Sequence, residues 1–173
     1  MDLKSKIREV PNWPIDGINF KDISTAIEDP EALKYIVDNL LEPYREQPVD
    51  KIVGIDARGF LLCSSMAYCL GTGCVMIRKK GKLPPKTVSK EYALEYGSDI
   101  IEMREDSIMP GENVVIVDDL LATGGTMAAT IDLVNRMGGH IIGVSFIIEL
   151  VFLKGREKLG TYPVYSLVRY NQE

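Results

Sequence analysis

Two adjacent aspartates, Asp118 and Asp119, end a hydrophobic run and are followed at once by a small polar loop. Residues 114–127 read VVIVDDLLATGGTM. Backbone N–H groups, hydroxyls and a helix N-terminus that meet at one loop form an anion site, most naturally for a phosphate. We expect such a loop at Ala122, Thr123, Gly124, Gly125 and Thr126. Carboxylates would repel that phosphate, so we expect them to bind the vicinal hydroxyls of a ribose, a task that a nearby divalent metal could share.

A less specific interpretation of the same stretch is a strand that ends in an Asp-rich turn before a Thr-capped helix. That interpretation would suffice for two aspartates alone. The full pattern DDxxATGGT, between a hydrophobic strand and an amphipathic helix, instead favours a site for ribose 5-phosphate. The main competing phosphate loops, GxxxxGK[ST] and GxGxxG, do not occur in the sequence.

The elements that must position this site alternate along the chain. Asp29 and Pro30 predict the N-cap and first turn of a helix with an apolar face. Further helices are expected at 59–70 and 126–137, and strands at 51–55, 74–77, 114–117, 141–150 and 164–168. Residues 79–99 are charged and lack a clear period, which predicts a long loop or a flexible hairpin. We therefore expect one α/β domain over 1–173, with a mostly parallel central sheet flanked by helices.

Composition narrows the classes of function. The chain has 173 residues, 46% hydrophobic and 26% charged, which is ordinary for a globular domain. A net charge of −5 disfavours nucleic acid as a partner. The charged N-terminus and the lack of long apolar runs predict neither secretion nor a membrane partner, and a cytoplasmic protein is expected. The one histidine argues against a His-based triad, and the three cysteines are expected to be small buried hydrophobes.

The motif at 114–127 closely resembles the phosphoribosyl-pyrophosphate motif of type I phosphoribosyltransferases. The resemblance covers almost the whole chain and is strongest to the members that act on adenine. Ordered matches to that family occur in GINFKDIS (17–24), GIDARGFL (54–61), IRKKGKLPPKT (77–87), EYALEYG (91–97) and LKGREKL (153–159). Five matches in order are far more specific than any one alone.

The resemblance implies a reaction and its participants. Ribose 5-phosphate would pass from phosphoribosyl pyrophosphate to adenine, giving AMP and pyrophosphate in purine salvage, through an oxocarbenium-like transition state. Such chemistry needs a held leaving group, a positioned base and exclusion of water more than it needs a nucleophile. The resemblance also implies Mg²⁺ as cofactor and a homodimer.

The resemblance further assigns roles to individual residues. The pyrophosphate would be held by Asp56, Ala57, Arg58, Arg78, Lys79 and Lys82, with the Asp56–Ala57 peptide cis and with Arg78 or Lys82 reaching across a dimer interface. Adenine would lie at Asn19, Phe20 and Lys21. Arg58 and Glu95 would act in catalysis, with Glu95 as general acid/base because Ala122 occupies the position where family members acting on 6-oxopurines carry an aspartate. Tyr96 would shield the site from water.

Alternatives remain at the level of residues and of the whole protein. The basic side chains and Glu95 would otherwise be ordinary surface charges, and Phe20 an ordinary core aromatic. Trp13, Asp16, Asn19 and Lys21 depart from the family's usual pattern, which questions side-chain contacts at 19 and 21. A phosphoribosyltransferase for another purine and a non-catalytic regulator are the rival functions. Ala122 and segment 17–24 argue against the first, and the intact loop segment argues against the second.

Overall fold

A seven-stranded sheet forms the centre of the protein in the computed structural model, which describes residues 1–93 and 97–172. The strand order is β5-β6-β4-β3-β7-β8-β9, and the five strands from β4 to β9 are mutually parallel. β6 is antiparallel to β4 and to β5. The strands are β3 (Lys51–Ile55), β4 (Gly73–Lys79), β5 (Thr87–Ala93), β6 (Ser98–Arg104), β7 (Asn113–Leu121), β8 (His140–Leu150) and β9 (Val164–Tyr170). The mostly parallel sheet predicted from the sequence is confirmed.

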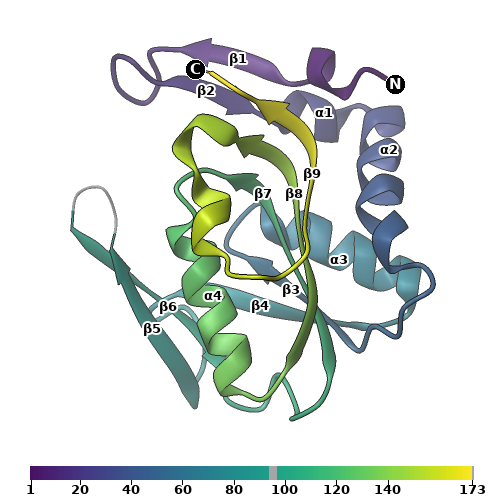
Figure 1. Cartoon of the computed structure of the whole chain (residues 1–173), viewed down its shortest axis with the longest axis vertical. Helices are drawn as coiled ribbons and strands as arrows, with labels where there is room; N and C mark the ends of the chain where they lie inside the picture. Colours follow the sequence, from purple (N-terminus) through teal and green to yellow (C-terminus); the bar gives the residue numbers. More distant parts are fainter. Residues whose placement is uncertain (94–96, 173) are drawn as a thin grey trace.

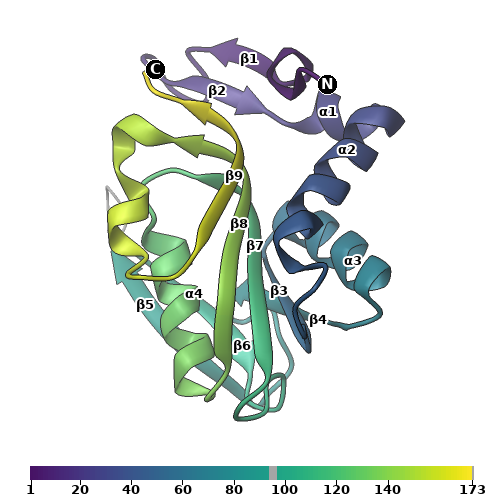
Figure 2. The same cartoon turned by 45° about the vertical axis from the view of Figure 1, so that its right-hand side comes forward.

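Helices cover both faces of this sheet (Figures 1 and 2). One face carries α1 (Ser24–Glu28), α2 (Pro30–Leu41) and α3 (Gly59–Leu70), and the other carries α4 (Gly125–Arg136). Two hydrophobic clusters result, and successive residues of one strand belong to different clusters, as Ile52 and Val53 do. Burial on both faces explains why the central strands are continuous apolar runs.

The helix boundaries follow the local signals expected from the sequence. The Asp29 carboxylate accepts hydrogen bonds from the N–H groups of Glu31 and Ala32, and Pro30 occupies the first turn of α2. Short 3₁₀ turns complete the regular structure, at η1 (Leu3–Lys6), η2 (Glu42–Tyr44), η3 (Val151–Leu153) and η4 (Gly155–Lys158). The Asp29 cap and Pro30 of α2 thus act at the predicted places.

A small antiparallel ribbon stands apart from the main sheet. It consists of β1 (Arg8–Pro11) and β2 (Asn19–Asp22), and periodicity did not predict it because each strand has only four residues. The ribbon lies beside the end of β9, so the N-terminal and C-terminal parts of the chain meet there (Figure 1). The Nζ of Lys21 lies 4.6 Å from the centre of the Tyr170 ring, which fixes this contact.

Three sequence-based expectations are refined or corrected. The strand expected at 114–117 continues to Leu121 because β8 remains paired with it, so Asp118 and Asp119 lie within β7 rather than after it. Segment 79–99 includes β5 and β6, so the hairpin alternative is the right one. The prediction of buried cysteines holds for Cys63 but is wrong for Cys69 and Cys74, which are exposed on α3 and β4.

Candidate functional site

The two aspartates lie side by side in β7 and have different partners. The backbone N–H of Asp119 donates to Oδ1 of Asp118 at 3.0 Å, and Oδ2 of Asp119 lies 3.0 Å from Nε of Arg58. Burial and then the Asp119 carboxylate raise the pKa of Asp118 well above its ordinary value. Burial also raises the pKa of Asp119, against the opposing effect of Arg58. The strand therefore holds two carboxylates that water solvates poorly, suited to partners such as sugar hydroxyls.

The loop after β7 has the form of a phosphate cradle. A hollow of about 80 Å³ is lined by Asp118 and by residues 120–127. Gly124 has φ +79° and directly precedes the twelve-residue helix α4, so the N-terminus of α4 opens towards the hollow. The predicted loop residues Ala122, Thr123, Gly125 and Thr126 all line this hollow. The structure thus places these loop residues around one hollow, and their binding of a phosphate stays a prediction.

Arg58 lies between this carboxylate pair and the β1–β2 ribbon. The Asp56–Ala57 peptide is cis, as the family resemblance implied. The guanidinium carbon of Arg58 lies 5.4 Å from the centre of the Phe20 ring. Gly59, the next residue, allows α3 to approach β7 closely, since a Cβ there would lie 2.9 Å from Oδ1 of Asp118. Arg58 thus connects Asp119 with the predicted base site.

A second hollow of about 280 Å³ lies between the carboxyl ends of β3, β4 and β7 and the β5–β6 hairpin at the edge of the sheet. Its lining is mixed, and comprises Ile55, Asp56, Ile77, Lys79, Tyr92, Asp99, Ile101, Asp118 and Thr126. Lys79 is paired with Asp99 at 3.1 Å, and the Ile100 N–H and Lys79 lower the pKa of Asp99. Sequence reasoning missed Tyr92 and Asp99. They oppose each other across the hairpin, a pairing that a register prediction would have indicated.

The other predicted pyrophosphate residues border this region. Nε of Arg78 donates to Oδ2 of Asp56 at 3.0 Å, and its Nη1 donates to the carbonyl oxygen of Lys82 at 3.2 Å. The Lys82 side chain itself is exposed. Arg78 therefore supports the segment around Asp56 in this structure, and Lys82 lies at the rim.

A third hollow of about 340 Å³ lies under the β1–β2 ribbon. Its lining comprises Val10, Trp13, Phe20, Asp22, Ser24 and Arg58. The rings of Trp13 and Phe20 meet edge to face with centroids 4.5 Å apart. This arrangement suits a flat heteroaromatic ligand.

The neighbouring predicted residues, Asn19 and Lys21, direct their side chains away from this hollow. Nδ2 of Asn19 donates to Glu9 at 2.7 Å, and Nζ of Lys21 lies 3.1 Å from the same Glu9 oxygen. Only their backbone groups remain as candidates for contact with a base in the hollow. Glu95 and Tyr96, the remaining predicted residues, lie outside the described residues.

Comparison with known proteins identifies the family. The model of the phosphoribosyl transferase domain matches residues 24–162. The chain belongs to this family. A similar curated relative is the adenine phosphoribosyltransferase of Clostridium tetani, 54% identical over 171 residues and 99% of both chains. The phosphoribosyltransferase class predicted from the sequence is confirmed.

Solved structures of phosphoribosyltransferases agree with this assignment. The adenine phosphoribosyltransferase of Thermoanaerobacter pseudethanolicus has a TM-score of 0.94 and 46% identity, covering 98% of both chains. The Saccharomyces cerevisiae enzyme, complexed with an imino-altritol bisphosphate and adenine, has a TM-score of 0.91 and 40% identity, covering 96% of both chains. The predicted fold is confirmed, and these relatives are adenine phosphoribosyltransferases, in agreement with the substrate predicted for this chain.

Two further observations concern metals and membranes. Within residues 1–93 and 97–172, no group of three or more His, Cys, Asp or Glu side chains is arranged to hold a metal ion. No helix in the same part of the chain is long and apolar enough to cross a membrane.

Proposed function

We propose that this phosphoribosyltransferase transfers ribose 5-phosphate from phosphoribosyl pyrophosphate to adenine, with release of AMP and pyrophosphate. The observation that carries the proposal is that the three hollows meet around two residues, Asp118 and Arg58. Asp118 lines the phosphate hollow and the hairpin hollow, and Arg58 joins Asp119 to the hollow with Phe20. A sugar phosphate, its leaving group and a flat base would each have a site around one C1′ position.

The sugar phosphate would lie along β7 and the N-terminus of α4. Backbone N–H groups of residues 122–126 and the hydroxyls of Thr123 and Thr126 would bind the 5′-phosphate. Asp118 and Asp119 would accept hydrogen bonds from the two ribose hydroxyls. Because both carboxylates are poorly solvated, such bonds would be stronger than the same bonds in water.

The pyrophosphate would occupy the hairpin hollow. Arg58, Arg78, Lys79 and Lys82, with the backbone at Asp56 and Ala57, would supply the positive charge and N–H donors that a polyanion needs. Arg58 and Lys79 are paired with Asp119 and Asp99, respectively. When pyrophosphate binds, these two cations would exchange their internal ion pairs for contacts to the leaving group. The internal pairs would also limit the electrostatic cost of keeping two cations at this site.

Mg²⁺ fits the donor set at this site. It typically takes one or two carboxylates together with substrate phosphate oxygens and water, and Asp118 and Asp119 supply two carboxylates beside the phosphate loop. When bound, Mg²⁺ would offset the charge of the pyrophosphate and help to bind the ribose hydroxyls.

Adenine would lie against Phe20, with the backbone of β2 reading its edge. In a strand, the C=O of Asn19 and the N–H of Lys21 point to the same edge, so one can accept from N6 while the other donates to N1. N9 would then attack C1′ as the bond from C1′ to the pyrophosphate oxygen breaks, and the pyrophosphate would leave with that electron pair. Glu95 would act as the general acid/base for the proton at N7, and Tyr96 would exclude water from the site.

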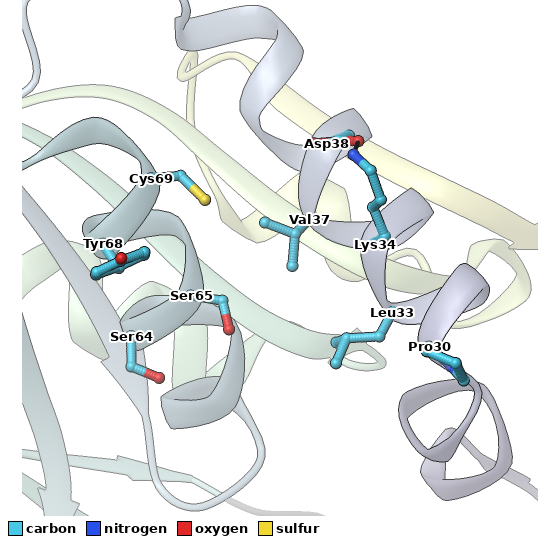
Figure 3. Close-up of a pocket in the computed structure, with 9 residues that line it drawn as sticks. All are labelled: Pro30, Leu33, Lys34, Val37, Asp38, Ser64, Ser65, Tyr68 and Cys69. Atoms are coloured by element: carbon cyan, nitrogen blue, oxygen red, sulfur yellow. Dashed lines mark hydrogen bonds and ion pairs between the residues drawn. The ribbon is translucent and has the colours of Figure 1, made fainter.

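A homodimer is the proposed assembly. Large apolar side chains are exposed at neighbouring places on α3 and β4: Leu61 is 48% exposed, Tyr68 89% and Met76 47%. Beside them a hollow of about 570 Å³ opens between α2 and α3, with Tyr68 and Cys69 on one side and Leu33 and Val37 on the other (Figure 3). An exposed apolar face of this kind is typical of a subunit interface. Arg78 follows Met76 on β4, so it or Lys82 would lie near the partner's site.

One assay tests the proposed reaction. The protein is mixed with adenine, phosphoribosyl pyrophosphate and Mg²⁺, and AMP and pyrophosphate are measured by chromatography. Equal molar amounts of both products are expected, and none when adenine is omitted. A protein that binds phosphoribosyl pyrophosphate but forms no AMP would refute the catalytic proposal in favour of the regulator alternative.

A further inference from the structure

The LKGREKL segment, 153–159, has no role in the proposed reaction, although the family resemblance included it. It contains the last residue of η3 and the whole of η4, between β8 and β9, and η4 lies against the first part of α4 (Figure 1). The segment therefore contacts the helix whose N-terminus forms the phosphate cradle.

Two glycines make this contact a backbone-to-backbone one. A Cβ on Gly155 would collide with the carbonyl oxygen of Ala122 and lie 3.0 Å from the N atom of Gly124. A Cβ on Gly124 would collide with the carbonyl oxygen of Gly155 and lie 3.1 Å from its Cα. Gly155 is not among the residues with positive φ, so its requirement for glycine is steric and not conformational. The turn thus limits where the backbone of the phosphate loop can lie.

An ion pair between a half-buried arginine and a buried glutamate holds the turn in place. The guanidinium of Arg156 donates to both oxygens of Glu149, from Nε at 2.9 Å and from Nη2 at 2.6 Å, while Nη1 donates to the carbonyl oxygen of Val164 at 2.9 Å. Ser166 also donates to Glu149 at 2.6 Å. The Glu149 side chain is only 4% exposed. Arg156 therefore ties the turn to the last residues of β8 and the start of β9 through a two-pronged bond with little freedom.

We propose that the Glu149–Arg156 pair is a positioning device for substrate binding: it presses Gly155 against Ala122 and Gly124 and so fixes the N–H groups of the phosphate loop for the 5′-phosphate. Neither side chain needs to touch substrate. The inference rests on the proposed placement of the 5′-phosphate at residues 122–126. It predicts a defect confined to that phosphate, because the leaving group and the base bind elsewhere.

The first test replaces Arg156 by Met and by Lys. Inhibition constants are measured for ribose 5-phosphate and for pyrophosphate, each against phosphoribosyl pyrophosphate, together with KM for adenine. Misplacement of supporting groups typically costs about 10–100-fold, so Arg156→Met should weaken ribose 5-phosphate by about 10-fold and leave pyrophosphate and adenine within about twofold. Arg156→Lys should lie between, since lysine keeps the charge but not the two-pronged geometry.

The matched control is Arg104→Met. Arg104 also binds one carboxylate with two nitrogens, Asp106 at 2.9 and 2.7 Å, but at the end of β6, and neither residue lines the three hollows. It should leave all three constants unchanged. Equal effects of Arg156→Met on ribose 5-phosphate, pyrophosphate and adenine would show a general structural role and overturn the proposal.

A second variant covers the case in which Arg156→Met does not fold. Gly155→Ala leaves the ion pair intact but adds the colliding methyl group, and it should also weaken ribose 5-phosphate selectively. Gly73→Ala is its control, since a Cβ there would meet only the movable end of Lys51. Unchanged affinity in Gly155→Ala would overturn the proposal.

Variants Thr123→Val and Thr126→Val separate the two levels of inference. If they leave ribose 5-phosphate binding unchanged, the placement of the 5′-phosphate is wrong. If they weaken it while Arg156→Met and Gly155→Ala do not, the placement stands and the positioning device alone is refuted.

Discussion

Asp118 and Asp119 are neighbours in one strand, yet the fold gives their carboxylates different partners. Asp119 has a cation, Arg58, at 3.0 Å, whereas Asp118 receives the N–H of Asp119 and forms no ion pair among the described residues. Both are proposed to bind ribose hydroxyls.

Changing either Asp118 or Asp119 to Asn should lower kcat/KM by about 10–10³-fold, the loss of about 1–4 kcal/mol of transition-state interaction. Steady-state kinetics check this, with Asp106→Asn as control, and wild-type values in both variants would contradict the assignment.

The unpaired carboxylate should also cost stability. Because its folded pKa is raised, Asp118 takes up a proton at higher pH in the folded state than in the unfolded state, so wild type gains stability as pH falls through the folded pKa. Asp118→Asn should therefore raise the free energy of unfolding at pH 7 by about 0.5–2 kcal/mol, the usual gain from one stabilising substitution. This gain in the free energy of unfolding should shrink as the pH falls towards the pKa that Asp118 has in the unfolded chain. Urea titrations at several pH values measure it.

The paired neighbour provides the contrast for that measurement. Asp119→Asn removes the partner of Arg58 and should not stabilise the protein. If Asp119→Asn raised the free energy of unfolding as much as Asp118→Asn does, the ion pair between Asp119 and Arg58 would contribute nothing to stability.

Glu95 is proposed to act in the chemical step. General acid/base groups typically contribute about 10²–10⁴-fold, so Glu95→Gln should lower kcat by that factor, with little change in affinity for phosphoribosyl pyrophosphate. Single-turnover kinetics isolate the step. Glu91→Gln, on β5 and bonded to Ser98 at 2.6 Å, is the control and should keep most of the activity. An unaltered rate for Glu95→Gln would assign the proton transfer to another group.

At the scale of elements, the β1–β2 ribbon presents one face and one edge to different neighbours. Phe20 faces the hollow with Arg58, while Asn19 and Lys21 turn to Glu9 on the opposite face. In the proposed reaction the base would be recognised by backbone groups, which cannot rotate as an Asn or Gln amide could. This explains how the chain tolerates unusual side chains at 19 and 21.

That geometry predicts strong discrimination between purines. Hypoxanthine carries an acceptor where adenine has its N6 donor, and usually a donor at N1, so both backbone contacts would be lost. Turnover of hypoxanthine should be lower by about 10⁴-fold, and Asn19→Val and Lys21→Arg should keep this preference. Competition assays with both bases measure it. Comparable turnover of hypoxanthine by wild type would contradict adenine recognition, and a variant that loses the preference would show that side chains read the base.

At the scale of the molecule, the face of α3 and β4 is proposed to join two copies. A charge placed at its most exposed aromatic position should break such an interface, because burying an unpaired carboxylate is costly. Tyr68→Glu should therefore sediment as a monomer at micromolar concentration where wild type is a dimer. Met109→Glu is the control, since Met109 is 61% exposed but lies in the turn after β6. Monomeric wild type in analytical ultracentrifugation would refute the dimer.

The sequence by itself determined the order of the elements and much of the site. Continuous apolar runs, the Asp29-Pro30 cap and the glycines after α4 are local signals, and they located most helices and the parallel strands within a few residues. The motif 114–127 indicated the ribose phosphate site for the same reason, since its parts are contiguous in the chain. Resemblance supplied the remaining roles, including the cis Asp56–Ala57 peptide.

Only the tertiary structure decided which distant residues meet. The extension of β7 through Asp118 and Asp119 depends on pairing with β8. The exposure of Cys74 depends on which face of β4 is covered, since Val75 and Ile77 on the opposite face are buried. The contact of Arg58 with Asp119 and Phe20 joins three separate segments. The seating of Gly155 on the phosphate loop likewise joins residues some thirty positions apart. Such contacts have no local signature, because they follow from the packing of the whole chain and not from the preferences of any one segment.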